Sequence, residues 1–174
     1  MHKGFNQNDL NLIRERINLL QRNHGIMTQL FKKYYKNKSY GEAFLYLFFS
    51  IELSLKFFIM GEMLIKEIKK IKRRKHSFYS FRYIKEVFKI TEFSPLINIF
   101  SLLYGDNIRN DLLKIKKERD CIIHTISKKN LDEKRIEKQF QKFFLNISTA
   151  FSNYVGFTTK IIDRNLKIIG KLKV

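Results

Sequence analysis

The chain contains one cysteine, Cys121, one proline, Pro95, and no tryptophan among its 174 residues. A single cysteine excludes an internal disulfide, fits a reducing compartment and argues against a zinc site built on thiolates. One proline and only 7 glycines favour long helices with few tight turns. No segment alternates apolar and polar residues over the length of a strand. The sequence therefore predicts an all-α helical bundle.

Long apolar runs are also missing. The longest, Ala43 to Ile51, is roughly half of what a membrane-spanning helix needs, and Glu52 and Lys56 interrupt the helix beyond it. The first twelve residues carry no apolar signal-peptide core. We expect a cytoplasmic protein without a membrane span.

Acidic residues are scarce, with 16 Asp and Glu against 35 Lys and Arg, which gives a formal net charge of +19. A field of this sign favours a polyanionic partner such as RNA, DNA or an anionic membrane surface. The alternative is a lysine-rich composition inherited from an AT-rich genome, which the abundance of Ile, Asn, Phe and Tyr also fits.

The apolar periodicity predicts five or six helices in a single domain, with a core at about 9–156 and a C-terminal tail at 157–174. Ser39 with Glu42, and Asn130 with Glu133, have the spacing of helix-capping pairs. Gly156 is expected to end or kink the last helix. The expected helices cover about 9–35, 39–74, 81–90, 94–103, 107–126 and 130–156.

A basic run ends the second expected helix. It extends from Lys66 to His76 and includes Lys72, Arg73 and Arg74. Such runs are usually solvated helix faces, and this one is also a candidate contact for an RNA backbone.

One short motif carries chemistry that suits phosphate. Arg119 offers a planar permanent charge, and His124 can exchange a proton near neutral pH. Arg119 takes an apolar position of its helix, so we expect it to face an acid, a cleft or another subunit. On an ideal helix His124 lies about 140° around the axis from Arg119. The two would therefore converge only if the last turn unwinds or if two copies meet, whereas Asp120, one turn before His124, could orient the imidazole.

Glu52 follows the apolar run directly and is expected to be half-buried. Its simplest partner is Lys56, four residues on. The sharper alternative is that Glu52 also holds Arg119.

This sequence resembles the HEPN superfamily (higher eukaryotes and prokaryotes nucleotide-binding), many of whose members are ribonucleases. Arg119-Asp120 through His124 is similar to the family's late-helix motif of arginine, polar residue and histidine. The segments 51–56 and 76–78 resemble its early acidic-plus-lysine signature and its inter-helix histidine segment. The resemblance covers about residues 39–154. In one departure, Ile126 stands where nucleotide-regulated members carry a tyrosine.

The resemblance implies an up-and-down bundle of four to five main helices that forms a homodimer, with two motifs at a shared cleft. It implies RNA cleavage without metal or cofactor, in which the RNA 2′-hydroxyl attacks the adjacent phosphate. His124 would act as acid or base, Arg119 would stabilise the transition state and Asp120 would position them. Lys116 and Lys117 would contact flanking phosphates.

Many relatives are toxins with a cognate antitoxin, or abortive-infection (anti-phage) effectors, so the resemblance also implies such a role. Two alternatives remain open. One is an RNA-binding scaffold that is indifferent to His124, and the other is a partner-binding module that works with an antitoxin-like protein.

Overall fold

The computed structural model of this chain describes residues 7–72, 86–87, 89–128 and 132–171. Within these ranges there are five α-helices, one 3-10 turn and no strand. The predicted all-α class is therefore confirmed. The expected helix at 81–90 lies largely outside the described residues. The chain forms two compact units, residues 1–104 and 105–174, and each is described by itself; the single domain expected from length stays a prediction.

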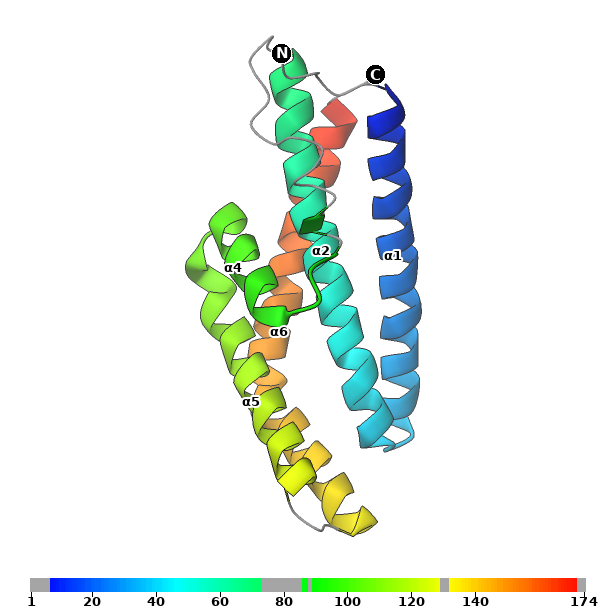
Figure 1. Cartoon of the computed structure of the whole chain (residues 1–174), viewed down its shortest axis with the longest axis vertical. Coiled ribbons are helices and arrows are strands. Elements are labelled where there is room, and N and C mark those ends of the chain that lie inside the picture. The colour runs from blue at the N-terminus through cyan, green and yellow to red at the C-terminus, as the bar shows by residue number, and fades with distance from the viewer. Residues whose placement is uncertain (1–6, 73–85, 88, 129–131, 172–174) are drawn as a thin grey trace. The chain divides into compact units, whose positions relative to one another are not determined.

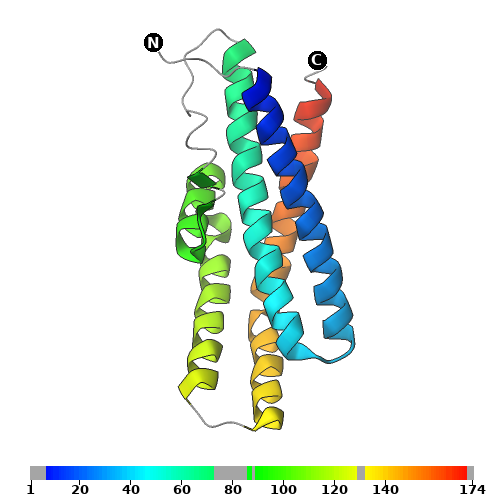
Figure 2. The same ribbon diagram turned by 45° about the vertical axis from the view of Figure 1, so that its right-hand side comes forward.

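In the first unit, α1 (Gln7–Lys36) and α2 (Tyr40–Lys72) form an antiparallel hairpin, side by side in Figures 1 and 2. Both helices begin close to the residues expected from the apolar periodicity, and α1 runs through Gly25 without a break. The core is formed by fully buried aliphatic side chains from both helices and from α4 (Phe93–Tyr104), which packs on α2. The most buried of them are Ile13, Leu47, Ile51, Leu55, Ile59, Leu96 and Ile97.

An aromatic contact attaches α4 to α2. The Tyr104 hydroxyl donates a hydrogen bond of 2.9 Å to the carbonyl of Phe58, and the Phe58 and Phe100 rings meet edge to face. Pro95 stands in the first turn of α4, where a missing N–H costs nothing.

Within the first unit, helix α2 packs against both α1 and α4. By length and composition alone, its segment Tyr40–Lys66 could cross a membrane. Of its most apolar stretch, 61% is buried within the protein, and the core helix of a soluble protein meets the same criterion. The expectation that the chain does not span a membrane stays a prediction.

The turn between α1 and α2 closes in an unusual way. The amide of Lys38 donates to the Tyr35 carbonyl and that of Ser39 to the Tyr34 carbonyl, at 3.1 and 3.0 Å. These two bonds form the Schellman pattern, in which the residue after the helix cap is left-handed and usually glycine. Here that residue is Lys38, with φ of 60°.

In the second unit, Gly105 with φ of 89° leads into the 3-10 turn η1 (Asp106–Ile108) and then α5 (Arg109–Lys128). Helix α5 lies antiparallel to α6 (Glu133–Lys171), as Figure 2 shows. Two exposed amides bridge the pair, because Asn146 donates to Glu118 and Asn153 to Asp111, at 2.8 and 3.1 Å. Buried side chains of this unit include Leu112, Ile115, Ile122, Phe143, Ile147 and Tyr154.

Helix α6 differs from expectation at both ends. Its cap is Asp132, whose carboxylate accepts the Arg135 amide at 2.8 Å, whereas Asn130 lies outside the described residues. Gly156 does not end the helix, and most of the expected tail at 157–174 belongs to α6, with Ile161 buried. The apolar stripe of the helix thus extends past the glycine and keeps it helical.

Candidate functional site

The motif occupies the second half of α5, which is continuous from Arg109 to Lys128. The last turn is not unwound, so Arg119 and His124 keep the separation of about 140° around the axis that an α-helix imposes. Of the two routes by which they could converge, unwinding does not occur in this structure. A single copy of α5 therefore presents the two side chains in different directions.

Arg119 forms an ion pair with the neighbouring Asp120. Its Nη1 lies 3.4 Å from Oδ1 of Asp120, and its side chain remains 37% exposed. The other carboxylate oxygen of Asp120 accepts a shorter bond, of 2.6 Å, from Nζ of Lys116. One carboxylate thus sits between two cations, and the three groups together keep a net charge of +1.

His124 is exposed, one turn closer to the end of the helix. Its carbonyl accepts a bond of 3.3 Å from the Ser127 hydroxyl. Among the described residues no hydrogen bond joins its imidazole to Asp120, because that carboxylate is turned toward Lys116 and Arg119. The interaction by which Asp120 could orient His124 is therefore not formed here, and Asp120 instead organises the two cations.

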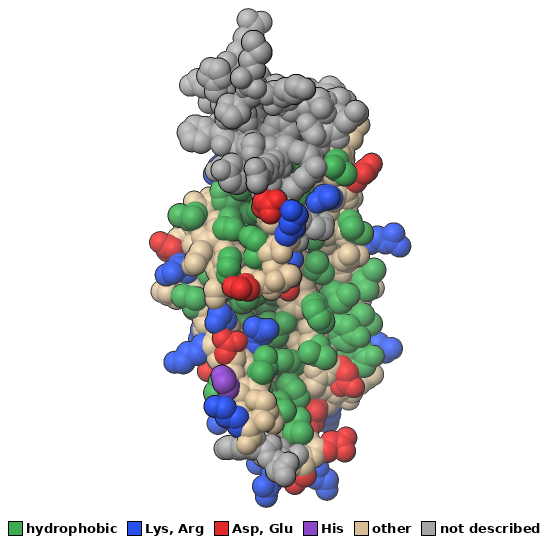
Figure 3. Space-filling view, in the orientation of Figure 1, with side chains coloured by type: hydrophobic (Ala, Val, Ile, Leu, Met, Phe, Trp, Pro, Cys, Tyr) green, Lys and Arg blue, Asp and Glu red, His purple; other side chains and the backbone are tan. Residues whose placement is uncertain are grey.

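The remaining candidate RNA contacts have different settings. Lys117 is exposed on α5. Lys72 is the last residue of α2, while Arg73 and Arg74 lie outside the described residues. On the face drawn in Figure 3, the lysines and arginines are interspersed with acidic and apolar side chains.

Glu52 makes the simpler of its two expected interactions. Its carboxylate accepts a bond of 2.7 Å from Lys56, whose side chain is only 9% exposed against 28% for Glu52. Burying an ammonium group is costly unless a charged partner offsets the loss of water. Glu52 is that partner for Lys56. Its suggested contact with Arg119 stays a prediction.

The structure shows a row of polar side chains, His24, Thr28 and Ser50, between α1 and α2. In the sequence the only sign of it is His24, a histidine among the apolar positions of its helix. The Thr28 hydroxyl lies 2.9 Å from that of Ser50 and 3.5 Å from Nε2 of His24. Burial lowers the pKa of His24 below its ordinary value, because the interior disfavours the charged imidazolium. His24 is thus an interface residue with structural hydrogen bonding.

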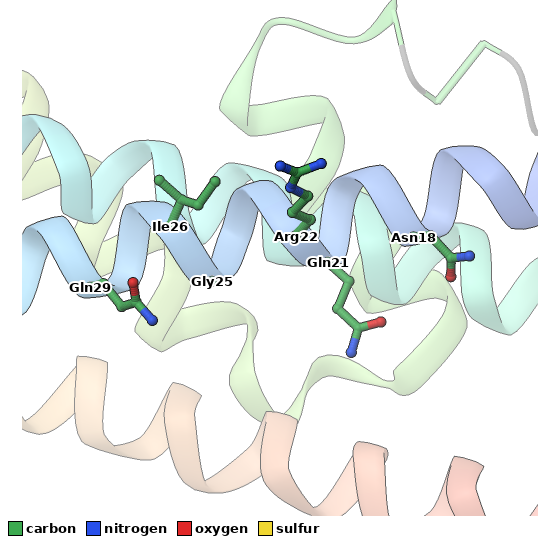
Figure 4. A pocket seen from close by; sticks show the side chains of 6 residues that line it. All are labelled: Asn18, Gln21, Arg22, Gly25, Ile26 and Gln29. Carbon is green, nitrogen blue, oxygen red and sulfur yellow. The ribbon is translucent and has the colours of Figure 1, made fainter.

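An open depression of about 420 Å³ lies along α1. Figure 4 shows Asn18 and Gln21 directed to one side of the helix and Arg22 to the other. A single arginine among amides offers no acid–base pair, so this depression has no catalytic constellation. Its lining residues are Asn18, Gln21, Arg22, Gly25, Ile26 and Gln29.

Within the described part of the chain, no group of three or more His, Cys, Asp or Glu side chains is placed to hold a metal ion. The expectation of metal-free chemistry stays a prediction. No family model, curated protein or solved structure matches this chain.

Proposed function

We propose that this protein is a metal-independent RNA endonuclease of the HEPN type, with Arg119 and His124 as its catalytic residues. The observation that carries the proposal is the segment of α5 on which Asp120 pairs with Lys116 and Arg119, with the exposed His124 one turn further along the helix. The net charge of +19 supports a polyanionic substrate. Further support comes from the resemblance of residues 119–124 to the family motif.

The reaction needs a base, an acid and a group that stabilises charge. The RNA 2′-hydroxyl gives its proton to a base, and its oxygen bonds to the adjacent phosphorus. The bond from phosphorus to the 5′-oxygen then breaks, and that oxygen takes a proton, leaving a 2′,3′-cyclic phosphate and a 5′-hydroxyl. His124 exchanges these protons, and Arg119 stabilises the negative charge on the phosphorane-like transition state.

The site requires two copies of the chain. Because Arg119 and His124 diverge on one helix, a complete constellation needs the arginine of one copy beside the histidine of another. In the homodimer proposed here, two α5 segments face each other across a cleft. Asp120 holds Arg119 and Lys116 until a phosphate displaces its carboxylate.

The test is cleavage of single-stranded RNA by purified protein, with analysis of the new ends. Wild type should leave cyclic phosphates, and should not cut DNA of the same sequence, which lacks the attacking hydroxyl. Arg119→Ala and His124→Ala should each lose at least about 100-fold in rate, as expected for removal of a charge-stabilising group or an acid–base group. Arg14→Ala, an exposed arginine on α1, is the matched control and should keep wild-type activity.

A second candidate function is favoured by the ion pairs of Asp120. A carboxylate that partly neutralises Arg119 and Lys116 suits a domain that binds RNA or a partner protein without cutting. If folded wild type and both motif variants bind RNA equally and none cleaves it, this scaffold replaces the nuclease.

The biological setting follows from the resemblance and remains part of the proposal. The enzyme would act in the cytoplasm as a toxin restrained by a cognate antitoxin, or as an effector of abortive infection. Growth arrest on expression of wild type, absent with His124→Ala, is the expected result.

A further inference from the structure

The turn between α1 and α2 carries a dense positive charge that the motif on α5 does not use. Four lysines occur within seven positions, Lys32, Lys33, Lys36 and Lys38, and all are exposed. None of them forms an ion pair with a described residue, and Glu42 is the only acid in residues 27–51. Two of them, Lys33 and Lys36, lie in the last turn of α1, where a positive charge interacts favourably with the negative end of the helix dipole. Helix stability does not explain the other two.

Aromatic rings lie between these lysines and are held in fixed orientations. Tyr34 is stacked on Tyr46 of α2, with ring centroids 5.3 Å apart and planes 12° apart, and Nζ of Lys33 lies 5.6 Å from the Tyr34 centroid. Tyr35 remains 44% exposed. Its ring contacts Phe31 at 5.7 Å and Tyr40, edge to face, at 5.6 Å. The tyrosine that solvent reaches is thus supported from two sides.

A backbone feature at Lys38 also points to function. A lysine with φ of 60° occupies the position where helix ends usually place glycine. An L-residue in this conformation costs about 1–2 kcal/mol, and such strained residues gather at functional sites. A charge is kept at the tip of the turn at the expense of stability.

From these observations we propose that the α1–α2 turn is a binding site for single-stranded nucleic acid. Lysine ammonium groups contact successive phosphates, and the solvent-accessible part of the Tyr35 ring stacks on an unpaired base. Positive charge beside a supported aromatic ring is the usual combination for sequence-tolerant single-strand binding. A duplex presents the same phosphates but keeps its bases stacked inside, so Tyr35 distinguishes the two. The proposal does not depend on cleavage at α5.

The experiment measures binding rather than activity. Fluorescence anisotropy with a labelled oligouridylate of about a dozen nucleotides follows affinity over a salt series starting near ~50 mM. The variant Lys32→Gln/Lys36→Gln/Lys38→Gln should bind about tenfold more weakly or worse, and its salt slope should be shallower by about 2, at ~0.7 per phosphate contact. The matched control removes three exposed lysines from α6 and should bind nearly as wild type. It carries Lys134→Gln, Lys138→Gln and Lys142→Gln.

The stacking step has its own variants. Tyr35→Ala should weaken single-strand binding by about 5- to 100-fold, whereas Tyr35→Phe, which keeps the ring, should restore it. Neither change should alter binding to a duplex of the same length, and deoxy- and ribo-oligonucleotides should show the same dependence on Tyr35. Circular dichroism verifies that every variant is folded.

Three results would overturn the proposal. The first is an equal loss of affinity in the two triple variants, which would indicate a diffuse field. The second is unchanged binding by Tyr35→Ala. The third is a loss confined to vesicles of phosphatidylserine and phosphatidylcholine, with RNA binding intact, which would assign the turn to a membrane surface.

Discussion

Replacing Lys38 with glycine should make the protein more stable even though it removes a surface side chain. The left-handed backbone at φ of 60° costs a side-chain-bearing residue about 1–2 kcal/mol. Glycine relieves that cost, but its larger conformational freedom in the unfolded chain lowers the gain in stability by about 0.4–1 kcal/mol. The net gain should be about 0.5–1 kcal/mol, or about 1–4 °C in Tm for a chain of this length. Thermal unfolding followed by far-UV circular dichroism measures it.

The control for this prediction is Lys38→Ala, which removes the same charge but keeps a Cβ in the strained position. It should leave stability within about 0.5 kcal/mol of wild type. A difference between the glycine and alanine variants therefore isolates the backbone. Equal stabilities of the two variants would refute the assignment of strain at Lys38. A lower Tm for Lys38→Gly would mean that the amide pattern of the turn does not hold in solution.

Three further predictions concern polar groups in the core. Burial lowers the pKa of His24, so at this position the unfolded chain binds a proton more readily than the folded protein. Stability should be unaffected above the ordinary pKa of 6.5 and should fall as the pH drops below it, by at most about 1.4 kcal/mol per pH unit. Urea unfolding of His24→Gln should show a shallower fall of stability with pH, and an unchanged slope would contradict the assignment. Ser101→Ala should stabilise by about 1 kcal/mol, since the buried Ser101 hydroxyl has no hydrogen-bond partner among the described residues; a loss in the same urea titration would point to a bound water. Glu52→Gln should lower the free energy of unfolding by about 2 kcal/mol, and Lys56→Met should lower it by less, because only Glu52→Gln leaves a buried ammonium without its carboxylate. The reverse order in chemical denaturation would show that the pair is not buried in solution.

Helix boundaries were predictable where the chain carries strong local signals. Ser39 precedes α2 directly, and its carbonyl accepts the Ala43 amide that opens the helix. Pro95 lies in the first turn of α4, and Gly105 supplies the positive φ between α4 and η1. These residues restrict the backbone through their own chemistry, so their effect does not depend on distant contacts.

Other features depend on contacts that a linear pattern does not contain. Gly156 resembles a helix end, but the apolar stripe continues beyond it to Ile161, and packing outweighs the intrinsic cost of a glycine, which is about 1 kcal/mol. Lys38 gives no warning of a left-handed turn, because that conformation normally selects glycine or asparagine.

The candidate site shows the same limit at the level of side chains. The spacing of Arg119, Asp120 and His124 fixes their angular positions on α5 but not the choice that Asp120 makes among its neighbours. With His124 four residues ahead and Lys116 four behind, either was within reach on one helix face. The carboxylate bonds to Lys116 at 2.6 Å and to Arg119 at 3.4 Å, because these two cations together attract it more strongly than the imidazole does.

That choice bears on how the proposed nuclease would work. The carboxylate of Asp120 bonds to Lys116 and Arg119 and not to His124. The His124 side chain is exposed on α5. A histidine that is not held by its own helix needs its orientation from outside, either from the phosphate it serves or from a second copy of the chain. An arginine held 140° away on the same helix needs a second copy for the same reason. The geometry of α5 therefore makes assembly a condition of the proposed chemistry, and the rate of RNA cleavage should rise with the square of protein concentration below the dissociation constant of the dimer.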